Sequence, residues 1–187
     1  YIKDVFIFPG YRLSSPPADT AKKDMTFTEG YYVLDRQKQY KPRLFKHTMQ
    51  FAPGDIYNRT DHNTTLSRLV NLGLFKFVKN RLEVVPSADS ALLNAYYYLT
   101  PFSRQALRAE INASTKSNNL TGSSVTMGWR KRNAFRGGEL LAIDATGGFE
   151  LQYSGQLKGY NTYRYGLEGN LSFPRFLIPF FDVSNKG

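Results

Sequence analysis

Four consecutive segments in the second half of the chain share one alternating pattern, and this pattern limits the possible folds more than any other feature. Apolar residues take every second position in residues 105–115, 123–132, 139–153 and 162–173. A period of two is typical of strands with one apolar and one polar face. Each segment matches the roughly 9 to 11 residues that a tilted strand needs to cross a bilayer.

Two environments produce such strands: a soluble sandwich, with the apolar face in the core, and a membrane barrel, with the apolar face toward lipid. Four long strands in succession favour the barrel. We then expect these side chains to face lipid: Leu107, Ile111, Val125, Met127, Ile143, Phe149, Leu167 and Leu171. We expect these to face the lumen: Arg108, Glu110, Asp144, Glu150, Arg164 and Glu168.

The composition narrows the class of protein. The chain has 187 residues, of which 41% are hydrophobic and 15% aromatic, so it can bury a core and should be rich in strands. It has no cysteine, which excludes disulfides and thiolate metal sites. No run of 18 apolar residues is present, which excludes a helical membrane span. The net charge of +10 favours an anionic partner: nucleic acid, lipid headgroups or lipopolysaccharide.

The first 104 residues show a mixed pattern. A strand is predicted at the start of the chain, followed by a polar loop or insertion over residues 12–30 and a short strand over 31–35. A helix is predicted over 41–50, with Pro42 in its first turn. A second helix runs up to Gly73, and two strands follow it. We expect Thr60, Asp61 or Asn63 to cap this helix, and Leu66, Leu69, Val70, Leu72 and Phe75 to be buried.

Little in the chain points to catalysis or to a metal. His47 and His62 are the two histidines, and they lie apart with no cysteine beside them, so we expect no metal, no cofactor and no catalytic residue. The stretch 128–139 combines basic and aromatic residues, as nucleic-acid sites do. A turn that contacts lipid headgroups or the domain formed by the first 104 residues explains it equally well, and we expect no nucleic-acid partner.

Two stretches resemble one protein family. Residues 51–86 resemble the POTRA domain of outer-membrane assembly factors of the BamA and TamA superfamily, and residues 133–152 resemble a turn between strands of the same family's barrel. The POTRA motif is carried by Pro53, Gly54, Asp55, Leu72, Gly73 and Phe75, with an edge strand containing Val78, Leu82 and Val84. The barrel turn is carried by Asn133, Phe135, Gly137 and Gly138.

The resemblance implies an α+β POTRA domain over residues 1–104, ordered strand-helix-helix-strand-strand, in the periplasm. Residues 105–187 would be the first four antiparallel strands of an outer-membrane β-barrel, which four strands alone do not close. The long insertion and the aromatic strands look most like the TamA-like proteins of Bacteroidetes.

The function that this implies is non-enzymatic assembly, insertion or translocation of outer-membrane proteins by strand templating. The partners would be unfolded clients, outer-membrane lipid or lipopolysaccharide, and accessory periplasmic or lipoprotein subunits. We expect the first barrel strand to act as a lateral gate that pairs with clients through Leu107, Arg108, Ala109, Glu110, Ile111, Asn112 and Ala113. The alternative is a soluble all-β binding or surface-adhesion module with a basic, aromatic face. An enzymatic domain upstream is a third possibility, which these residues do not decide.

Overall fold

The computed structural model describes residues 1–12, 25–86, 91–115, 120–152 and 161–174. The chain divides into two compact units. The first comprises residues 1–103, 133–139 and 173–187, and the second comprises residues 104–132 and 140–172.

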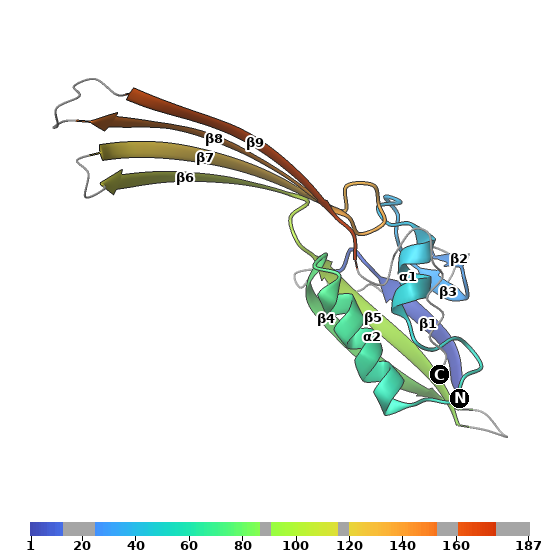
Figure 1. The fold of residues 1–187 in the computed structure, drawn as a ribbon. Helices are drawn as coiled ribbons and strands as arrows, with labels where there is room; N and C mark the ends of the chain where they lie inside the picture. The colour runs from blue at the N-terminus through green and yellow to red at the C-terminus, as the bar shows by residue number, and fades with distance from the viewer. Residues whose placement is uncertain (13–24, 87–90, 116–119, 153–160, 175–187) are drawn as a thin grey trace. The chain divides into compact units, whose positions relative to one another are not determined.

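The first unit is built on a five-stranded sheet with the strand order β2-β3-β1-β5-β4 (Figure 1). β1 lies in the middle and pairs in parallel with both β3 and β5. β2 and β4 pair antiparallel with their neighbours. The bounds of the strands are β1 (Ile2–Phe8), β2 (Thr26–Thr28), β3 (Tyr31–Val33), β4 (Phe75–Val85) and β5 (Leu92–Pro101).

Two helices, α1 (Pro42–Thr48) and α2 (Arg59–Asn71), cover one face of this sheet (Figure 1). Pro42 stands in the first turn of α1, where a missing N–H leaves no bond unmade. α2 ends before Gly73, whose φ of +66° strains any residue with a Cβ. The predictions of a helix beginning at Pro42 and of a helix end at Gly73 are confirmed.

The start of α2 differs from the prediction of a cap at Thr60, Asp61 or Asn63, which is wrong. The N-cap is Asn58, whose side-chain oxygen accepts a hydrogen bond of 2.8 Å from the Thr60 N–H. Several residues in this stretch have side chains suited to capping, so their chemistry alone does not identify which one takes the N-cap position.

The main core lies between the helices and the sheet. Leu69, Leu72 and Phe75 are buried in it, as predicted, and Leu66 packs against it half-buried. Val70 is 56% exposed, so its predicted burial is wrong. The remaining helical and strand residues of this core include Leu44, Phe45, Val5, Ile7, Ala95, Tyr97 and Leu99.

An aromatic layer lies on the opposite face of the same sheet. The Phe6 ring stacks between Tyr32 and Tyr96, with centroid distances of 5.2 and 4.8 Å. Phe8 stacks on Tyr98 at 4.9 Å. The sheet is therefore apolar on both faces where β1 crosses it, which accounts for the run of buried residues at the end of this strand.

The expected α+β POTRA domain, with the order strand-helix-helix-strand-strand, is wrong. The antiparallel pair β2–β3 stands between β1 and α1, and the described chain is mostly β, with two sheets and two helices. β2 lies in the stretch 12–30, predicted to be a loop or insertion because it has no apolar period. Its three residues pair with β3 across a two-residue hairpin turn, Glu29 and Gly30, whose φ angles are +54° and +88°. Three residues are too few to show a period of two in the sequence. Residues 13–24 of that stretch are outside the described residues.

The second unit is an antiparallel four-stranded sheet with the order β6-β7-β8-β9, drawn as a curved ribbon in Figure 1. The strands are β6 (Gln105–Thr115), β7 (Leu120–Arg132), β8 (Leu140–Gln152) and β9 (Asn161–Ser172). They contain 11 to 13 residues, about twice the usual length in globular sheets. The four alternating segments are thus confirmed as strands.

Neither helix in the described part of the chain is long and apolar enough to span a bilayer.

Candidate functional site: the four-stranded sheet

β6, the strand predicted to be the gate, forms one edge of the four-stranded sheet. Its ladder with β7 runs without interruption from Gln105, opposite Lys131, to Thr115, opposite Thr121. Within the described residues, no strand pairs with its other edge. Such an edge offers backbone N–H and C=O groups to a further strand, which is the chemical requirement for strand addition.

The pairing register sorts the side chains of this sheet onto two faces, because directly opposite residues in a ladder share a face. Leu107, for example, stands opposite Trp129, which stands opposite Ile143. All eight residues that the sequence predicts to face lipid lie on this one face, and all six predicted to face the lumen lie on the other. The gate residues divide in the same way, with Leu107, Ala109, Ile111 and Ala113 on the first face and Arg108, Glu110 and Asn112 on the second.

The apolar face is open to solvent in the described structure. Leu107, Ile111 and Leu167 are 80%, 75% and 80% exposed. Soluble monomers rarely expose continuous apolar patches of this kind, and an apolar face on several neighbouring strands indicates contact with another apolar phase.

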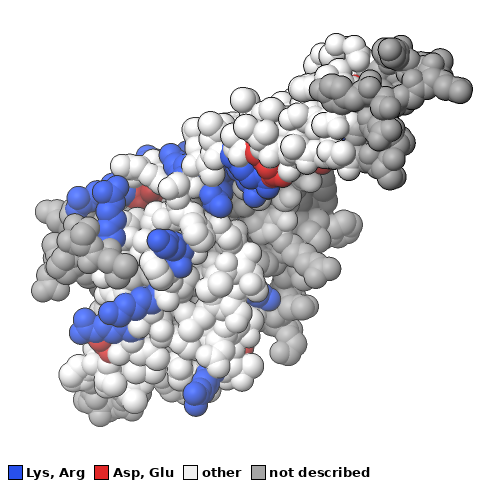
Figure 2. Space-filling model, turned by 90° about the vertical axis from the view of Figure 1, so that its left-hand side faces the viewer, with Lys and Arg blue, Asp and Glu red and all other residues white. Residues whose placement is uncertain are grey.

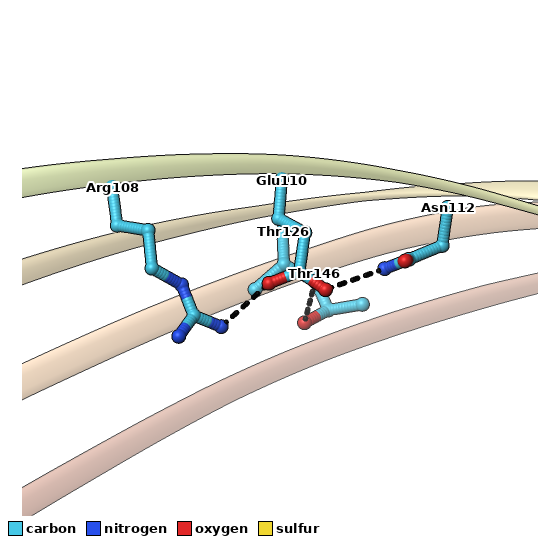
Figure 3. Close-up of polar contacts among 5 residues, drawn as sticks. All are labelled: Arg108, Glu110, Asn112, Thr126 and Thr146. Carbon is cyan, nitrogen blue, oxygen red and sulfur yellow. Dashed lines mark hydrogen bonds and ion pairs between the residues drawn. The ribbon is translucent and has the colours of Figure 1, made fainter.

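The opposite face carries a polar network (Figure 3). The Arg108 guanidinium pairs with the Glu110 carboxylate at 2.8 Å, and Glu110 also accepts a hydrogen bond of 3.0 Å from the Asn112 amide. The hydroxyls of Thr126 and Thr146 lie 3.2 Å apart on β7 and β8. These charges meet partners on their own face, as groups lining a wet interior would.

Glycines on the polar face make room for the charged side chains. Gly128 stands opposite Arg108 on one side and Asp144 on the other, and a Cβ at Gly128 would collide with the Asp144 carboxylate. A Cβ at Gly122 would come within 2.7 Å of the Glu150 Cγ. The sequence pattern shows these glycines only as breaks in the polar alternation, and the register supplies their role.

β4, the predicted edge strand of the first unit, lies at an edge of the five-stranded sheet. Val78, Leu82 and Val84 stand on its helix-covered face. Val78 and Leu82 pack against the core, whereas Val84, farther along the strand, is 71% exposed. The described residues include no strand paired with the outer side of β4.

The residues Pro53, Gly54 and Asp55 hold the start of β1. The Ile2 N–H donates to the Asp55 carbonyl and the Gly54 N–H donates to the Ile2 carbonyl, each at 2.8 Å. The Asp55 carboxylate accepts a hydrogen bond from the Ala52 N–H, also at 2.8 Å. The hydrogen bonds of Gly54 and Asp55 therefore fix the backbone of this loop against the start of β1.

The predicted barrel turn joins β7 to β8 over residues 133–139, which belong to the first unit. Asn133 accepts a hydrogen bond of 3.0 Å from the Gly138 N–H and donates one of 2.7 Å to the Gln39 carbonyl. The buried Glu139 carboxylate accepts hydrogen bonds from the N–H groups of Phe135 and Gly137, at 3.1 and 3.0 Å. The turn therefore has a fixed internal structure.

His62 lies in a place that the sequence does not reveal. It stands near the start of α2 among residues suited to capping, but it is 7% exposed, with its Nε2 2.9 Å from the Asn80 amide nitrogen and its Nδ1 3.3 Å from the Tyr97 hydroxyl. Burial lowers the pKa of His62. This side chain links α2 to β4 and β5.

Basic groups prevail over acidic ones on the face shown in Figure 2, in keeping with the net charge of +10. The described residues contain no cluster of three or more His, Asp or Glu side chains that could hold a metal ion.

Comparisons with known proteins find solved structures that are similar to this chain at low sequence identity. No protein-family model and no curated protein matches the chain. It is similar to the solved structure of CdiB from Acinetobacter baumannii, with a TM-score of 0.45 and 10% identity over 78% of this chain and 22% of that one. It is also similar to BamA from Haemophilus ducreyi lacking POTRA domains 1–3, with a TM-score of 0.42 and 12% identity over 94% of this chain and 32% of that one.

The chain thus spans less than a third of the length of either structure. BamA is one of the two family names given by the sequence resemblance. The finer assignment to the TamA-like type remains a prediction.

Proposed function

We propose that this chain is part of a non-enzymatic outer-membrane protein that assembles, inserts or secretes other proteins, and that β6 is the strand at which clients are added. The second unit then lies in the outer membrane as part of a barrel, and residues 1–104 lie in the periplasm. The partners are unfolded client proteins, outer-membrane lipid or lipopolysaccharide, and accessory subunits.

The observation that carries this proposal is that, over four long paired strands, every side chain predicted to face lipid lies on one face of the sheet and every side chain predicted to face the lumen lies on the other. Hydrocarbon satisfies the exposed apolar face, while the ladder hydrogen bonds satisfy the backbone between the edges. An edge left unpaired in lipid is costly, because its N–H and C=O groups have no water to bind. β6 therefore requires a partner strand, from the rest of the barrel or from a client.

The apolar side chains of the proposed gate strand, β6, suit many different client strands. Leu107, Ala109, Ile111 and Ala113 are small to medium in size and provide no deep pocket for one particular side chain. Main-chain hydrogen bonds would supply the affinity, and these are common to all sequences. The outer edge of β4 is proposed as a second, periplasmic place for strand addition.

Crosslinking of the seam tests the proposal. Cysteines are placed at Leu107 or Ile111 and in the final strand of the full-length protein. This chain contributes no cysteine of its own, and any cysteine elsewhere in the full-length protein is first replaced by serine, so that only the introduced thiols react. Oxidation should stop client insertion, and reduction should restore it.

A matched control locks two strands that are not at the seam. Thr126 and Thr146 stand directly opposite each other on β7 and β8, so cysteines there should crosslink without closing the gate. Insertion that continues in the oxidised seam variant would contradict the gate. A protein that stays monomeric in water without detergent would instead favour the soluble binding module.

A further inference from the structure

A cavity of about 240 Å³ opens in the first unit, beside β2, β3 and the start of α1. Its wall is apolar at Val33 and Phe45, which are 8% and 1% exposed, and at the half-buried Tyr40. Basic residues complete its lining: Lys38, Lys41 and Arg136.

The charges at this cavity are unbalanced. One carboxylate lines it, that of Asp35, and one of its oxygens accepts a hydrogen bond of 2.8 Å from the Tyr40 N–H. Thr28 also lines the cavity, and the carboxylate of the next residue, Glu29, pairs with the Lys46 ammonium at 2.9 Å. Three basic residues therefore line the cavity against one acidic residue, whose carboxylate accepts a backbone hydrogen bond.

Two of the three cations stand at strained backbone positions. Lys38 has a φ of +49° and Arg136 a φ of +68°, in the left-handed region that glycine and asparagine adopt at lower cost. The two residues are also tied together, because the Arg136 guanidinium donates to the Lys38 carbonyl at 3.3 Å. The Arg136 carbonyl accepts a hydrogen bond of 2.7 Å from the Lys41 N–H. Strain of this kind is often retained where a side chain serves a ligand.

We propose that this cavity binds an alkyl phosphate, the headgroup and first methylenes of a lipid-like molecule. The alkyl part lies against Val33 and Phe45, and the phosphate is held by Lys38, Lys41 and Arg136. A phosphate monoester carries about two negative charges and several acceptor oxygens, which suits three cations better than a single carboxylate does.

Calorimetric titration of the full chain in a non-ionic detergent tests the assignment. Hexyl phosphate is compared with hexanol, which lacks the anion, with inorganic phosphate, which lacks the chain, and with hexanoate. We expect measurable binding of hexyl phosphate and at least roughly fivefold weaker binding of the other three ligands. Equal binding of hexanol would overturn the role of the cations, and equal binding of hexanoate would overturn the choice of phosphate.

Lys38→Gly separates ligand binding from structure. It removes one cation and also relieves the left-handed backbone, so the melting temperature should stay the same or rise while hexyl phosphate binds roughly fivefold more weakly. Lys79→Gln is the control, since it removes an exposed cation on β4 outside the cavity and should leave binding unchanged. Unchanged binding in Lys38→Gly, or an equal loss in Lys79→Gln, would overturn the proposal. All proteins are measured in the same detergent, so partitioning of hexyl phosphate into micelles lowers its free concentration equally in each titration.

Discussion

Leu69 and Val70 are neighbours on α2 in opposite surroundings, since Leu69 is fully buried and Val70 is 56% exposed. Leu69→Asp should unfold the first unit, because truncation of a buried leucine alone costs about 2 to 5 kcal/mol and an unpaired carboxylate adds to that cost. Val70→Asp, one residue away, should leave the melting temperature nearly unchanged. Thermal unfolding followed by circular dichroism measures both, and equal effects would contradict the orientation of α2.

Protonation of His62 should destabilise the first unit. Its pKa is lowered by burial from an ordinary value of 6.5, so the unfolded chain takes up the proton at a higher pH than the folded one. The stabilising contribution is therefore complete above pH 6.5 and is lost as the pH falls below that value. His62→Gln keeps a polar group near Asn80 and Tyr97 without titrating there. In urea unfolding from pH 7.5 to 5, the free energy of unfolding should depend less steeply on pH in this variant than in the unchanged protein. The same pH dependence in both proteins would mean that other titratable groups cause it.

His62 also shows what sequence reasoning could not supply at this scale. The residue stands among Thr, Asp and Asn side chains, which are common at helix starts, so its surroundings in sequence indicate a cap. Its real partners, Asn80 and Tyr97, lie on strands 18 and 35 residues further along the chain. A buried polar contact across such separations leaves no local pattern.

Elements with a strong period were predicted well. The period of two in β6 to β9 was visible because each strand is long and each residue contributes to one face. β2, with three residues, is too short to show a period of two, although the turn of Glu29 and Gly30 that pairs it with β3 is a local feature. The strand β6 and the turn 133–139 could be located from sequence, and the role of β6 as a gate stays a prediction. Of the basic residues at the cavity, Arg136 lies within the predicted turn, whereas Lys38 and Lys41 lie in a stretch with no recognisable motif.

Arginine substitution along β7 should give a response with a period of two. Met127→Arg places a charge on the apolar face, which costs about 2 to 4 kcal/mol near the middle of a bilayer. Thr126→Arg places it on the polar face, where the cost is much smaller. Folding into liposomes, followed by gel mobility and urea titration, compares the two. Equal effects would indicate that both faces meet water.

The turn 133–139 should tolerate little change at Gly138. Its φ is +94°, and a Cβ there would lie 3.0 Å from Pro174 and 3.3 Å from Leu44. Gly138→Ala should therefore destabilise the first unit by about 1 to 3 kcal/mol. Gly169→Ala is the control, since nothing lies within 4 Å of its added Cβ. A comparable loss of stability in Gly169→Ala would mean that an added Cβ is costly even where nothing lies near it, and would contradict the role given to this turn.

At the scale of the whole molecule, the first unit is made of segments that are distant in sequence. A chain truncated after Ser103 would lack the turn 133–139, and with it the hydrogen bonds to Gln39 and Lys41. We expect faster amide exchange at Lys41 and a lower melting temperature than in the full chain. Hydrogen–deuterium exchange measures the first, and unchanged protection at Lys41 would mean that the turn is dispensable.

The strand order of the five-stranded sheet could not be predicted for the same reason. Local patterns located β1, β4 and β5, but not which strands would be neighbours. The expectation of a POTRA domain came from a resemblance over residues 51–86, which does not include β1, β2 or β3. The parallel pairings of β1 lie outside that stretch.

The central place of β1 has a consequence for the order of events after the chain emerges from a ribosome or a translocon. β1 comes first but must wait for β5, since Phe6 pairs with Tyr96. β3 can pair with one edge of β1 early, but the edge toward β5 stays unpaired over that interval, whereas each strand of the second unit pairs with the next one to appear. High contact order slows folding, so the first unit should be the slower to form and the one on which a holding chaperone acts.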